Sequence, residues 1–219
     1  MQDQTAQIEW REGGVPVSVR FDDPYFSLDD GMAETAHVFL GGNDLPERFA
    51  DGFHVAELGF GTGLNFLVAL RAFRACGCGG TLRFTSFEAY PMEISDLHAA
   101  LRAFDGLPDD LARVTEFPTR LEGVDFDLRV IHGDARESLP AWEGRADAWF
   151  LDGFSPAKNP ELWSPEMMRA VSCHTAPNGT AATYTAAGFV RRGLADAGFN
   201  VHRVQGYGRK RHMTRAVMP

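Results

Sequence analysis

The chain has 219 residues, of which 44% are hydrophobic, and it carries a formal net charge of −9. This length suits one globular domain with a sizeable core, and the negative charge disfavours a long non-specific nucleic-acid surface, because counterion release requires many basic contacts. No stretch approaches the ~20 apolar residues of a membrane-spanning helix, and the first residues lack the basic and apolar regions of a signal peptide. The sequence therefore predicts a soluble, cytoplasmic protein that does not act at a membrane.

The cysteines and histidines form no metal-binding pattern. Cys76, Cys78 and Cys173 lack the paired C-x-x-C spacing of a zinc site, and the seven histidines are scattered along the chain. We expect three ordinary reduced thiols and no bound metal.

Within a single domain, residues 1–50 are expected to comprise an N-terminal hairpin, which covers the main domain, and a substrate-side loop, and residues 51–219 are expected to form the core. Apolar and polar residues alternate on both sides of Gly13 and Gly14, which predicts a hairpin over residues 8–18. Residues 21–30 are polar, aromatic and interrupted by proline, so a loop is expected. Its Tyr25 and Phe26 either contact a ligand or anchor the loop to the core. A short helix is expected over residues 34–40.

Residues 55–65 combine a short apolar run, an acid, three glycines and the start of an amphipathic helix near Leu64. The pattern Gly59-x-Gly61-x-Gly63 allows a sharp turn and close approach to a ligand, towards which the helix N–H groups point. It differs from the G-x-G-x-x-G of dinucleotide folds, and Glu57 would repel a pyrophosphate. The pattern suits a ligand with a cationic amino group, such as S-adenosylmethionine. A glycine turn that binds nothing is the alternative.

Three further predicted strands are followed by acids. The strands cover residues 81–88, 124–132 and 147–152, and the acids are Glu88, Asp134 and Asp152. In open α/β sheets, ligands bind at the carboxyl ends of the strands, so Glu88 is placed for ribose hydroxyls and Asp134 for an adenine amino group. A helix is expected over residues 92–104, and a short helix with a strand-like connection over residues 107–122.

The C-terminal third is expected to alternate between helices over residues 164–174 and 187–197 and strands over residues 179–184, 200–204 and 212–218. The short connection between the last two strands implies an antiparallel hairpin. Without a substrate in view, a solvated rim is the favoured interpretation of the late basic residues. These are Arg191, Arg192, Arg203, Arg209, Lys210, Arg211 and Arg215.

Asp152 precedes a loop that Gly153 and Pro156 make rigid, and Phe154 in this loop is placed to stack on a substrate. Methyl transfer requires the acceptor lone pair to lie in line with the sulfonium–methyl bond. An alkylammonium has no lone pair until a proton leaves, and a carboxylate such as Asp152 can bind the amine and take or relay that proton. Ser155 does not lie in a G-x-S-x-G motif, which disfavours a hydrolase.

Five motifs resemble the methyltransferase domain of tRNA 5-methylaminomethyl-2-thiouridine biosynthesis enzymes, in the stand-alone form without an FAD oxidase domain. They lie at residues 21–27, 57–66, 150–160, 187–194 and 206–211. The resemblance implies a Rossmann-like class I S-adenosylmethionine-dependent methyltransferase fold, an α/β fold with a mostly parallel sheet and a C-terminal antiparallel hairpin. It also implies methylation of the 5-aminomethyl nitrogen of the wobble uridine, in the anticodon region of tRNA, without a metal. A separate FAD-dependent oxidase would act in the same pathway.

The same resemblance assigns site residues. Asp152 is the expected catalytic residue and meets the acceptor amine. The acceptor side is expected to comprise Tyr25, Phe26, Phe154, Pro156 and Lys158, and Arg191, Arg192, Arg209, Lys210 and Arg211 are expected to contact tRNA. The cofactor side is expected to comprise Glu57, Gly59, Gly61, Thr62, Gly63, Asn65, Glu88, Ala89, Asp134, Ala135 and Asp152.

Two other classes of function stay open at this point. A small-molecule amine N-methyltransferase would use the same cofactor turn and the same acid, with basic loops that are merely solvated. A binding module would keep the cofactor without catalysis.

Overall fold

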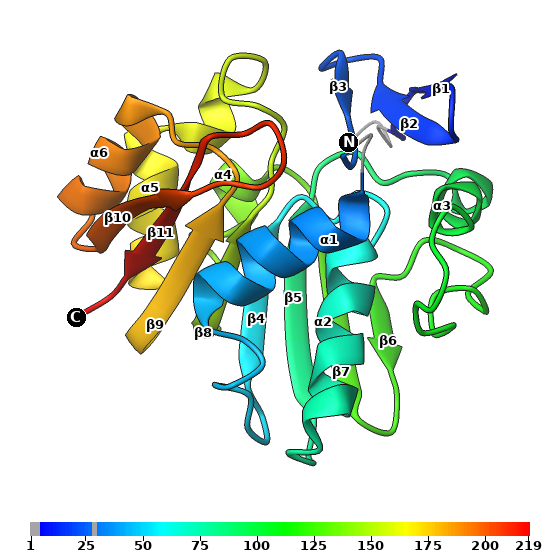
Figure 1. Cartoon of the computed structure of the whole chain (residues 1–219), viewed down its shortest axis with the longest axis horizontal. Helices are drawn as coiled ribbons and strands as arrows, with labels where there is room; N and C mark the ends of the chain where they lie inside the picture. Colours follow the sequence, from blue (N-terminus) through cyan, green and yellow to red (C-terminus); the bar gives the residue numbers. More distant parts are fainter. Residues whose placement is uncertain (1–4, 28–29) are drawn as a thin grey trace.

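The computed structural model of the protein describes residues 5–27 and 30–219, and its largest feature is an eight-stranded sheet (Figure 1). Strands β4, β5, β7, β8 and β9 are parallel, whereas β6, β11 and β10 each pair antiparallel to their neighbour. The order across the sheet is β10 (Asn200–Gln205), β11 (His212–Val217), β9 (Thr175–Thr183), β8 (Ala146–Leu151), β4 (His54–Leu58), β5 (Leu82–Glu88), β7 (Phe126–His132) and β6 (Arg120–Glu122).

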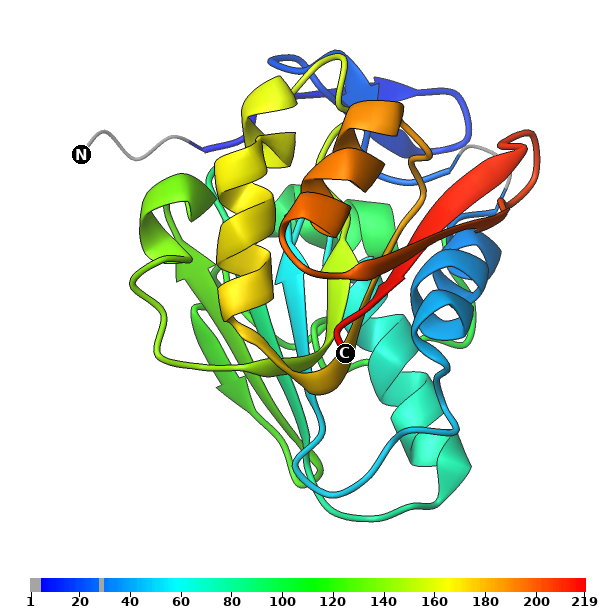
Figure 2. The ribbon, with the colours of Figure 1, turned by 90° about the vertical axis from the view of Figure 1, so that its left-hand side faces the viewer.

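Helices cover both faces of this sheet, with α1 and α2 on one face and α5 and α6 on the other (Figures 1 and 2). The first face carries α1 (Gly31–Thr35), the π-helical η1 (Ala36–Leu40), the short η2 (Gly41–Asn43), α2 (Leu64–Cys76) and α3 (Ile94–Leu101). The second face carries α4 (Ala135–Ser138), η3 (Pro160–Trp163), α5 (Pro165–Cys173) and α6 (Gly188–Asp196). The expected α/β fold with a mostly parallel sheet and a C-terminal antiparallel hairpin is confirmed.

The central strand β4 shows why the sheet is buried on both sides. Its side chains alternate between the two faces, so Val55 packs into the cluster beneath α2, and Ala56 and Leu58 pack into the cluster beneath α5 and α6. Glu57 points to the same side as Val55 and is fully buried. The strand therefore carries an acid into the core at the position where the glycine turn begins.

A second, three-stranded sheet consists of β1 (Ile8–Arg11), β2 (Val15–Ser18) and β3 (Asp23–Pro24). The antiparallel pairing of β1 with β2 confirms the predicted hairpin, and Gly13 and Gly14 at its turn have the positive φ angles that favour glycine. The segment predicted as a loop contributes the two-residue strand β3, and its residues 28–29 lie outside the described part of the chain. The sheet lies above the carboxyl ends of the parallel strands (Figure 1).

Three expectations about local structure need correction. Residues 107–119 form turns instead of a short helix, because Pro108 and Pro118 interrupt the segment and Leu111 is its one fully buried apolar anchor. The helix expected over residues 34–40 is longer and runs from Gly31 through η2. The core also begins before residue 51, since Val38, Phe39 and Phe49 are part of its larger cluster.

The expectation of three free thiols is wrong at two positions, because Cys76 and Cys78 form a disulfide. Helix α2 ends at Cys76, and Gly77 then reverses the chain with φ 64°, which brings the two Cα atoms to 5.4 Å. Cys173 is free and exposed. Within the described residues, no helix combines the length and the apolar content that crossing a membrane requires.

Two adjacent glycines in η2 provide a test of how this segment packs on the sheet. A Cβ at Gly42 would lie 2.6 Å from the Cβ of Ala182 and 3.0 Å from Cε of Met213, whereas a Cβ at Gly41 would meet only the carbonyl oxygen of Ala36, at 3.6 Å. Gly42→Ala is expected to lower the free energy of unfolding by about 1–3 kcal/mol through overpacking. Gly41→Ala, in helical backbone at φ −60°, should change the free energy of unfolding by no more than about 0.5 kcal/mol or raise it slightly. Urea denaturation of both variants measures the difference, and equal effects would contradict the packing.

Candidate active site

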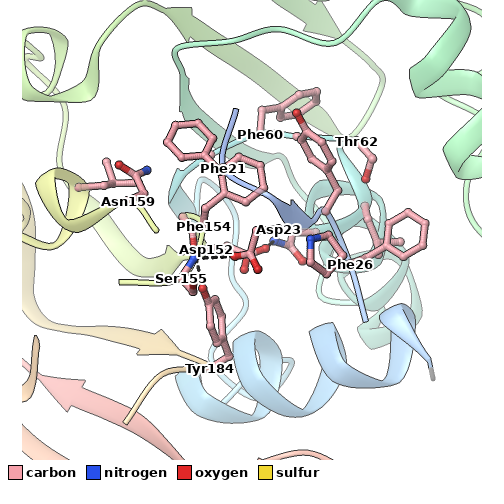
Figure 3. Close-up of a pocket in the computed structure, with 18 of the residues that line it drawn as sticks. Phe21, Asp23, Phe26, Phe60, Thr62, Asp152, Phe154, Ser155, Asn159 and Tyr184 are labelled. Atoms are coloured by element: carbon pink, nitrogen blue, oxygen red, sulfur yellow. Dashed lines mark hydrogen bonds between the residues drawn. The ribbon is translucent and has the colours of Figure 1, made fainter. Parts of the chain in front are cut away.

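The carboxyl ends of the parallel strands open into a cavity of about 640 Å³, a size typical of small-molecule sites. The small sheet and the loop between β10 and β11 form its other walls. Figure 3 shows Phe21, Asp23, Phe154, Asp152 and Tyr184 around this hollow. Its lining includes these predicted site residues: Tyr25, Phe26, Gly59, Gly61, Thr62, Asn65, Glu88, Ala89, Asp134, Ala135, Asp152, Phe154, Arg209 and Lys210.

Other predicted site residues lie outside the lining. Glu57 is buried beneath the cavity, and Gly63 is packed against Phe60 and Leu111. The remaining members of this group lie on the loop after Asp152, on α6 or at the tip of the C-terminal hairpin, and they are Pro156, Lys158, Arg191, Arg192 and Arg211.

The three glycines of the turn have different tasks. All three have positive φ, at 91°, 52° and 75° for Gly59, Gly61 and Gly63. Gly61 lines the cavity, and a Cβ there would lie 3.1 Å from the Tyr25 ring. A Cβ at Gly63 would lie 2.5 Å from a methyl group of Leu111. The second glycine therefore keeps the cavity open, and the third allows α2 to start against packed side chains.

Glu88 ties the glycine turn to β5. Its Oε2 accepts a hydrogen bond from the Gly61 N–H at 2.9 Å, and its Oε1 accepts one from the Tyr90 N–H at 2.7 Å. Burial raises the pKa of Glu88, and the N–H groups of Gly61, Tyr90 and Phe60 act against that rise. The two carboxylate oxygens together have about four acceptor sites, so Glu88 retains capacity for a ligand hydroxyl.

Asp134 forms the N-cap of α4 by accepting a hydrogen bond from the Arg136 N–H at 2.9 Å. The Arg136 guanidinium also donates to both carboxylate oxygens, and this contact lowers the pKa of Asp134. Asp134 is therefore ionised and held in place at the cavity wall.

A single amide joins Glu57 and Asp152. The Asn65 Nδ2 donates to Oε1 of Glu57 at 2.9 Å and to Oδ2 of Asp152 at 2.6 Å. The hydroxyl of Ser86 donates to the other oxygen of Glu57 at 2.8 Å, and the hydroxyl of Thr35 donates to Oδ1 of Asn65 at 2.8 Å. Glu57 thus acts on the cavity through Asn65, and Asp152 is the acid of this pair that reaches the cavity.

Burial raises the pKa of Asp152 to about 7. The hydrogen bond from Asn65 opposes this rise, the charge of Glu34 adds to it, and the charge of Lys210 opposes it. Burial also raises the pKa of Glu57 well above its usual range. A carboxyl group that titrates near neutral pH in a cavity is suited to proton transfer.

Aromatic rings form one wall of the cavity. Phe21 and Phe154 stack with ring centroids 4.7 Å apart, and Tyr25 meets Phe154 edge-on at 5.1 Å. Phe26 packs against Phe104 at 4.8 Å. Tyr25 and Phe26 pack against the core, which confirms that they anchor the loop, and both line the cavity, where their contact with a ligand stays a prediction.

Lys158 lies outside the cavity lining and stabilises the aromatic wall. Its ammonium contacts Asp22 and lies 3.7 Å from Asp23, while the Ser155 N–H donates to Asp23 at 2.8 Å. Tyr184 lines the cavity but was not predicted from the sequence, because it lies in none of the motifs. Its hydroxyl donates to the Gly153 carbonyl at 2.8 Å, and the Lys210 ammonium lies 4.2 Å above its ring while pairing with Glu34 at 2.7 Å. Thr35 and Glu34 were missed for the same reason, since they also lie outside the motifs.

The late basic residues divide into two groups. Arg215 pairs with Asp44, and Lys210 pairs with Glu34, so both serve contacts within the protein. Desolvation lowers the pKa of His212, and the charges of Arg203, Arg211 and Arg191 lower it further. Arg203, Arg211 and His212 also line a shallow groove beside the hairpin loop.

Residues 104–219, slightly more than half of the chain, match the profile of a family described as S-adenosyl-L-methionine-dependent methyltransferases. The chain belongs to this family. Its methyl donor is therefore S-adenosylmethionine.

Relatives of this methyltransferase include proteins named tRNA 5-methylaminomethyl-2-thiouridine biosynthesis bifunctional protein MnmC. The chain is 46% identical to the one from Pseudomonas aeruginosa over 96% of its own length, and 43% identical to the one from Stutzerimonas stutzeri over 97%. It spans 34% of the length of either relative. These values confirm the resemblance drawn from the motifs.

A solved structure supports the same fold. MnmC2 from Aquifex aeolicus is 27% identical to this methyltransferase, with a TM-score of 0.76, over 100% of this chain and 72% of the other. The TrmN structure from Thermus thermophilus, at 19% identity and a TM-score of 0.52, shares the fold.

The cavity of this methyltransferase fits S-adenosylmethionine. The side of Gly61 that faces the cavity carries no Cβ, so a ligand can approach the backbone there. The acids of the lining suit an ammonium and a sulfonium, and Glu88 retains acceptor capacity for ribose hydroxyls. Within the described residues, no group of three or more His, Cys, Asp or Glu side chains could hold a metal ion.

Gly61→Val is expected to weaken S-adenosylmethionine binding by roughly 100-fold or more, because the side chain would fill the approach to the turn and meet Tyr25. Gly52→Val is the matched control, because Gly52 also has positive φ, at +75°, but a Cβ there meets nothing within 4 Å. Calorimetry on both variants measures the affinities. Equal affinity of Gly61→Val and the parent protein would place the cofactor elsewhere.

Proposed function

We propose that the protein transfers a methyl group from S-adenosylmethionine to the 5-aminomethyl nitrogen of 5-aminomethyl-2-thiouridine at the wobble position of tRNA, giving 5-methylaminomethyl-2-thiouridine. The observation that carries this proposal is the half-buried Asp152 carboxyl group at the cavity, held by the Asn65 amide and with its pKa raised to about 7. The names of the MnmC relatives, at 43% and 46% identity, supply the substrate.

The cofactor is proposed to lie along the turn of Gly59 and Gly61, with Glu88 on the ribose and Asp134 near the adenine. Thr62, Ala89 and Ala135 complete this side of the cavity. S-adenosylmethionine supplies an electrophilic methyl group in this position. The Asp152 carboxylate, which the Asn65 amide holds at this end of the turn, would attract the methionine ammonium.

Asp152 is proposed to receive the acceptor amine. An alkylammonium is attracted by the acids on this side, which include Asp23 and Glu34. Once it is bound, the Asp152 carboxylate accepts one proton, and the neutral nitrogen has the lone pair that methyl transfer requires. Phe154, Phe21 and Tyr25 offer apolar surface for the uracil ring, and their positions fix the direction from which the amine approaches.

Asp152→Asn is expected to reduce the single-turnover rate of methyl transfer by about 10²–10⁴-fold, because the amide keeps the size of the side chain but cannot accept the proton. In the parent protein, the rate should rise with pH around a midpoint near 7, since the carboxylate is the active form and exists above its pKa. In the variant, the rise of the rate around pH 7 should be absent. Part of the methyl-transfer rate should return only at high pH, where the amine is already neutral.

Asp147→Asn is the matched control, because Asp147 lies in β8, the strand that Asp152 follows, and accepts a hydrogen bond from the His54 N–H outside the cavity lining. Rates are measured with saturating cofactor and tRNA that carries 5-aminomethyl-2-thiouridine. A rate for Asp152→Asn within a few-fold of the parent would remove Asp152 from the chemistry. Equal methylation of small amines and tRNA would favour a small-molecule N-methyltransferase.

The tRNA is proposed to bind across the basic residues of α6 and the C-terminal hairpin. The net charge of −9 makes any phosphate contact local, and Arg191, Arg203 and Arg211 converge near His212. Arg192 and Arg209 are proposed as neighbouring contacts. We also propose that the reaction occurs in the cytoplasm. A separate FAD-dependent oxidase is proposed to produce the aminomethyl group from its carboxymethyl form before methylation.

Joint replacement of Arg191, Arg203 and Arg211 by glutamine should weaken tRNA binding and flatten the slope of log K against log salt concentration by about 2–3, because fewer counterions are released. Replacement of Arg113 and Arg120 by glutamine is the control, since these exposed arginines pair with Asp109 and Glu122 elsewhere on the surface. Titrations at several salt concentrations measure the slopes. Equal slopes for the two variants would leave the basic residues as a solvated rim.

A further inference from the structure

Thr35 is a buried residue at the end of α1 that contacts the site through Asn65. It is 4% exposed, and its hydroxyl bonds to the Asn65 side chain, which is itself 6% exposed. The two residues are 30 positions apart in the sequence and come from different helices. A buried hydroxyl with a polar partner is expected to have a defined donor and acceptor role.

The hydrogen-bond inventory of Asn65 determines that role. A side-chain amide has two N–H donors and one carbonyl acceptor, and both donors are used, on Glu57 and Asp152. The carbonyl oxygen faces the Thr35 hydroxyl, which must therefore donate. The opposite amide orientation would turn the oxygen of Asn65 towards two carboxyl groups, and both contacts would become oxygen against oxygen.

We propose that Thr35 is a positioning residue, whose hydroxyl locks the Asn65 amide so that its NH2 group holds Oδ2 of Asp152 and leaves Oδ1 for the substrate proton. The part played by Oδ1 rests on the proposed function. The lock itself concerns the orientation of Asn65 and the charge state of Asp152, and it holds for the protein without any substrate.

The charged groups around Asp152 make its charge state depend on the Asn65 donor. Burial, Glu34 on α1 and Asp23 on β3 all disfavour the charged form of Asp152, while Asn65 and the Lys210 ammonium favour it. Glu57 on β4 shares the Asn65 amide, Glu88 on β5 acts on Glu57, and Tyr184 after β9 faces Asp152 with a hydroxyl whose own pKa burial raises. Loss of the Asn65 donor would leave Lys210 as the favourable group among these named neighbours.

Thr35→Val removes the hydroxyl donor at nearly constant volume, and Thr35→Ser keeps the donor. Thr175→Val is the matched control, because the Thr175 hydroxyl is also buried and donates, to the Val171 carbonyl at 2.7 Å, at the amino end of the parallel strands. The first measurement is the pKa of Asp152 in the ligand-free protein, from ¹³C-carboxyl NMR with Asp152→Asn to assign the signal. The second is the pH profile of single-turnover methyl transfer.

The pKa of Asp152 should rise by about 1–2 units in Thr35→Val, the effect of one hydrogen bond to a charged group. Because the active carboxylate then exists only at higher pH, the rising limb of the rate profile should move upward equally, and the rate at pH 7 should fall roughly 5- to 50-fold. Thr35→Ser and Thr175→Val should stay within about 0.3 unit of the parent. Where the valine variant does not fold, Thr35→Ala, which adds no atoms, takes its place with the same expectation.

Two results would overturn the proposal. One is a pKa of Asp152 that moves no more in Thr35→Val, or in Thr35→Ala, than in Thr175→Val. The other is a Thr35→Ser variant that shifts as much as Thr35→Val, which would mean that size and not the donor matters. A parent protein that methylates no tRNA, combined with the shifted carboxyl titration in Thr35→Val, would refute the proposed function and support the lock.

Discussion

The parallel pairing of β4 with both β5 and β8 is the constraint on which the rest of the structure depends. Its register aligns Leu58 with Phe87 and with Leu151, so the chain leaves all three strands at one edge of the sheet. Glu57, Glu88 and Asp152 are far apart in the sequence, yet this register gathers them beneath and around one cavity. Bringing buried carboxyl groups together is unfavourable unless donors compensate them. The glycine turn, α2 and α1 are arranged so that these donors are present.

The compensation differs between the two ends of the cavity. Glu88 is held by backbone N–H groups, whose positions are fixed by the glycine turn itself. Asp152 and Glu57 are held by one side-chain amide, whose orientation depends on a third side chain. Backbone donors make the end proposed for the cofactor rigid. At the end proposed for the acceptor, side-chain donors allow the proton affinity of Asp152 to change. This suits a group that has to exchange a proton during each turnover.

Local patterns in the sequence predicted the elements that local residues determine. The glycine turn, the start of α2 near Leu64 and the C-terminal hairpin were correct because glycine spacing, helical periodicity and loop length carry this information directly. The disulfide between Cys76 and Cys78 was missed because it depends on the chain reversal at Gly77. Thr35, Glu34 and Tyr184 were missed because their roles arise from contacts between segments far apart in the chain. Asp152 was placed at the cavity by its motif, whereas its pKa depends on burial that no motif records.

The small N-terminal sheet is attached to the main domain near the cavity mainly through polar and ring contacts. Asp23 accepts from the Ser155 N–H, Lys158 pairs with Asp22 and Asp23, and Phe21 stacks on Phe154. The residues proposed to hold the cofactor, in contrast, follow directly from strands of the central core. The two halves of the cavity therefore have separate structural supports. Changes in the small sheet can therefore reshape the wall proposed for the methyl acceptor while the framework proposed for the methyl donor is kept, so a fold of this kind can change its acceptor and still bind the same cofactor.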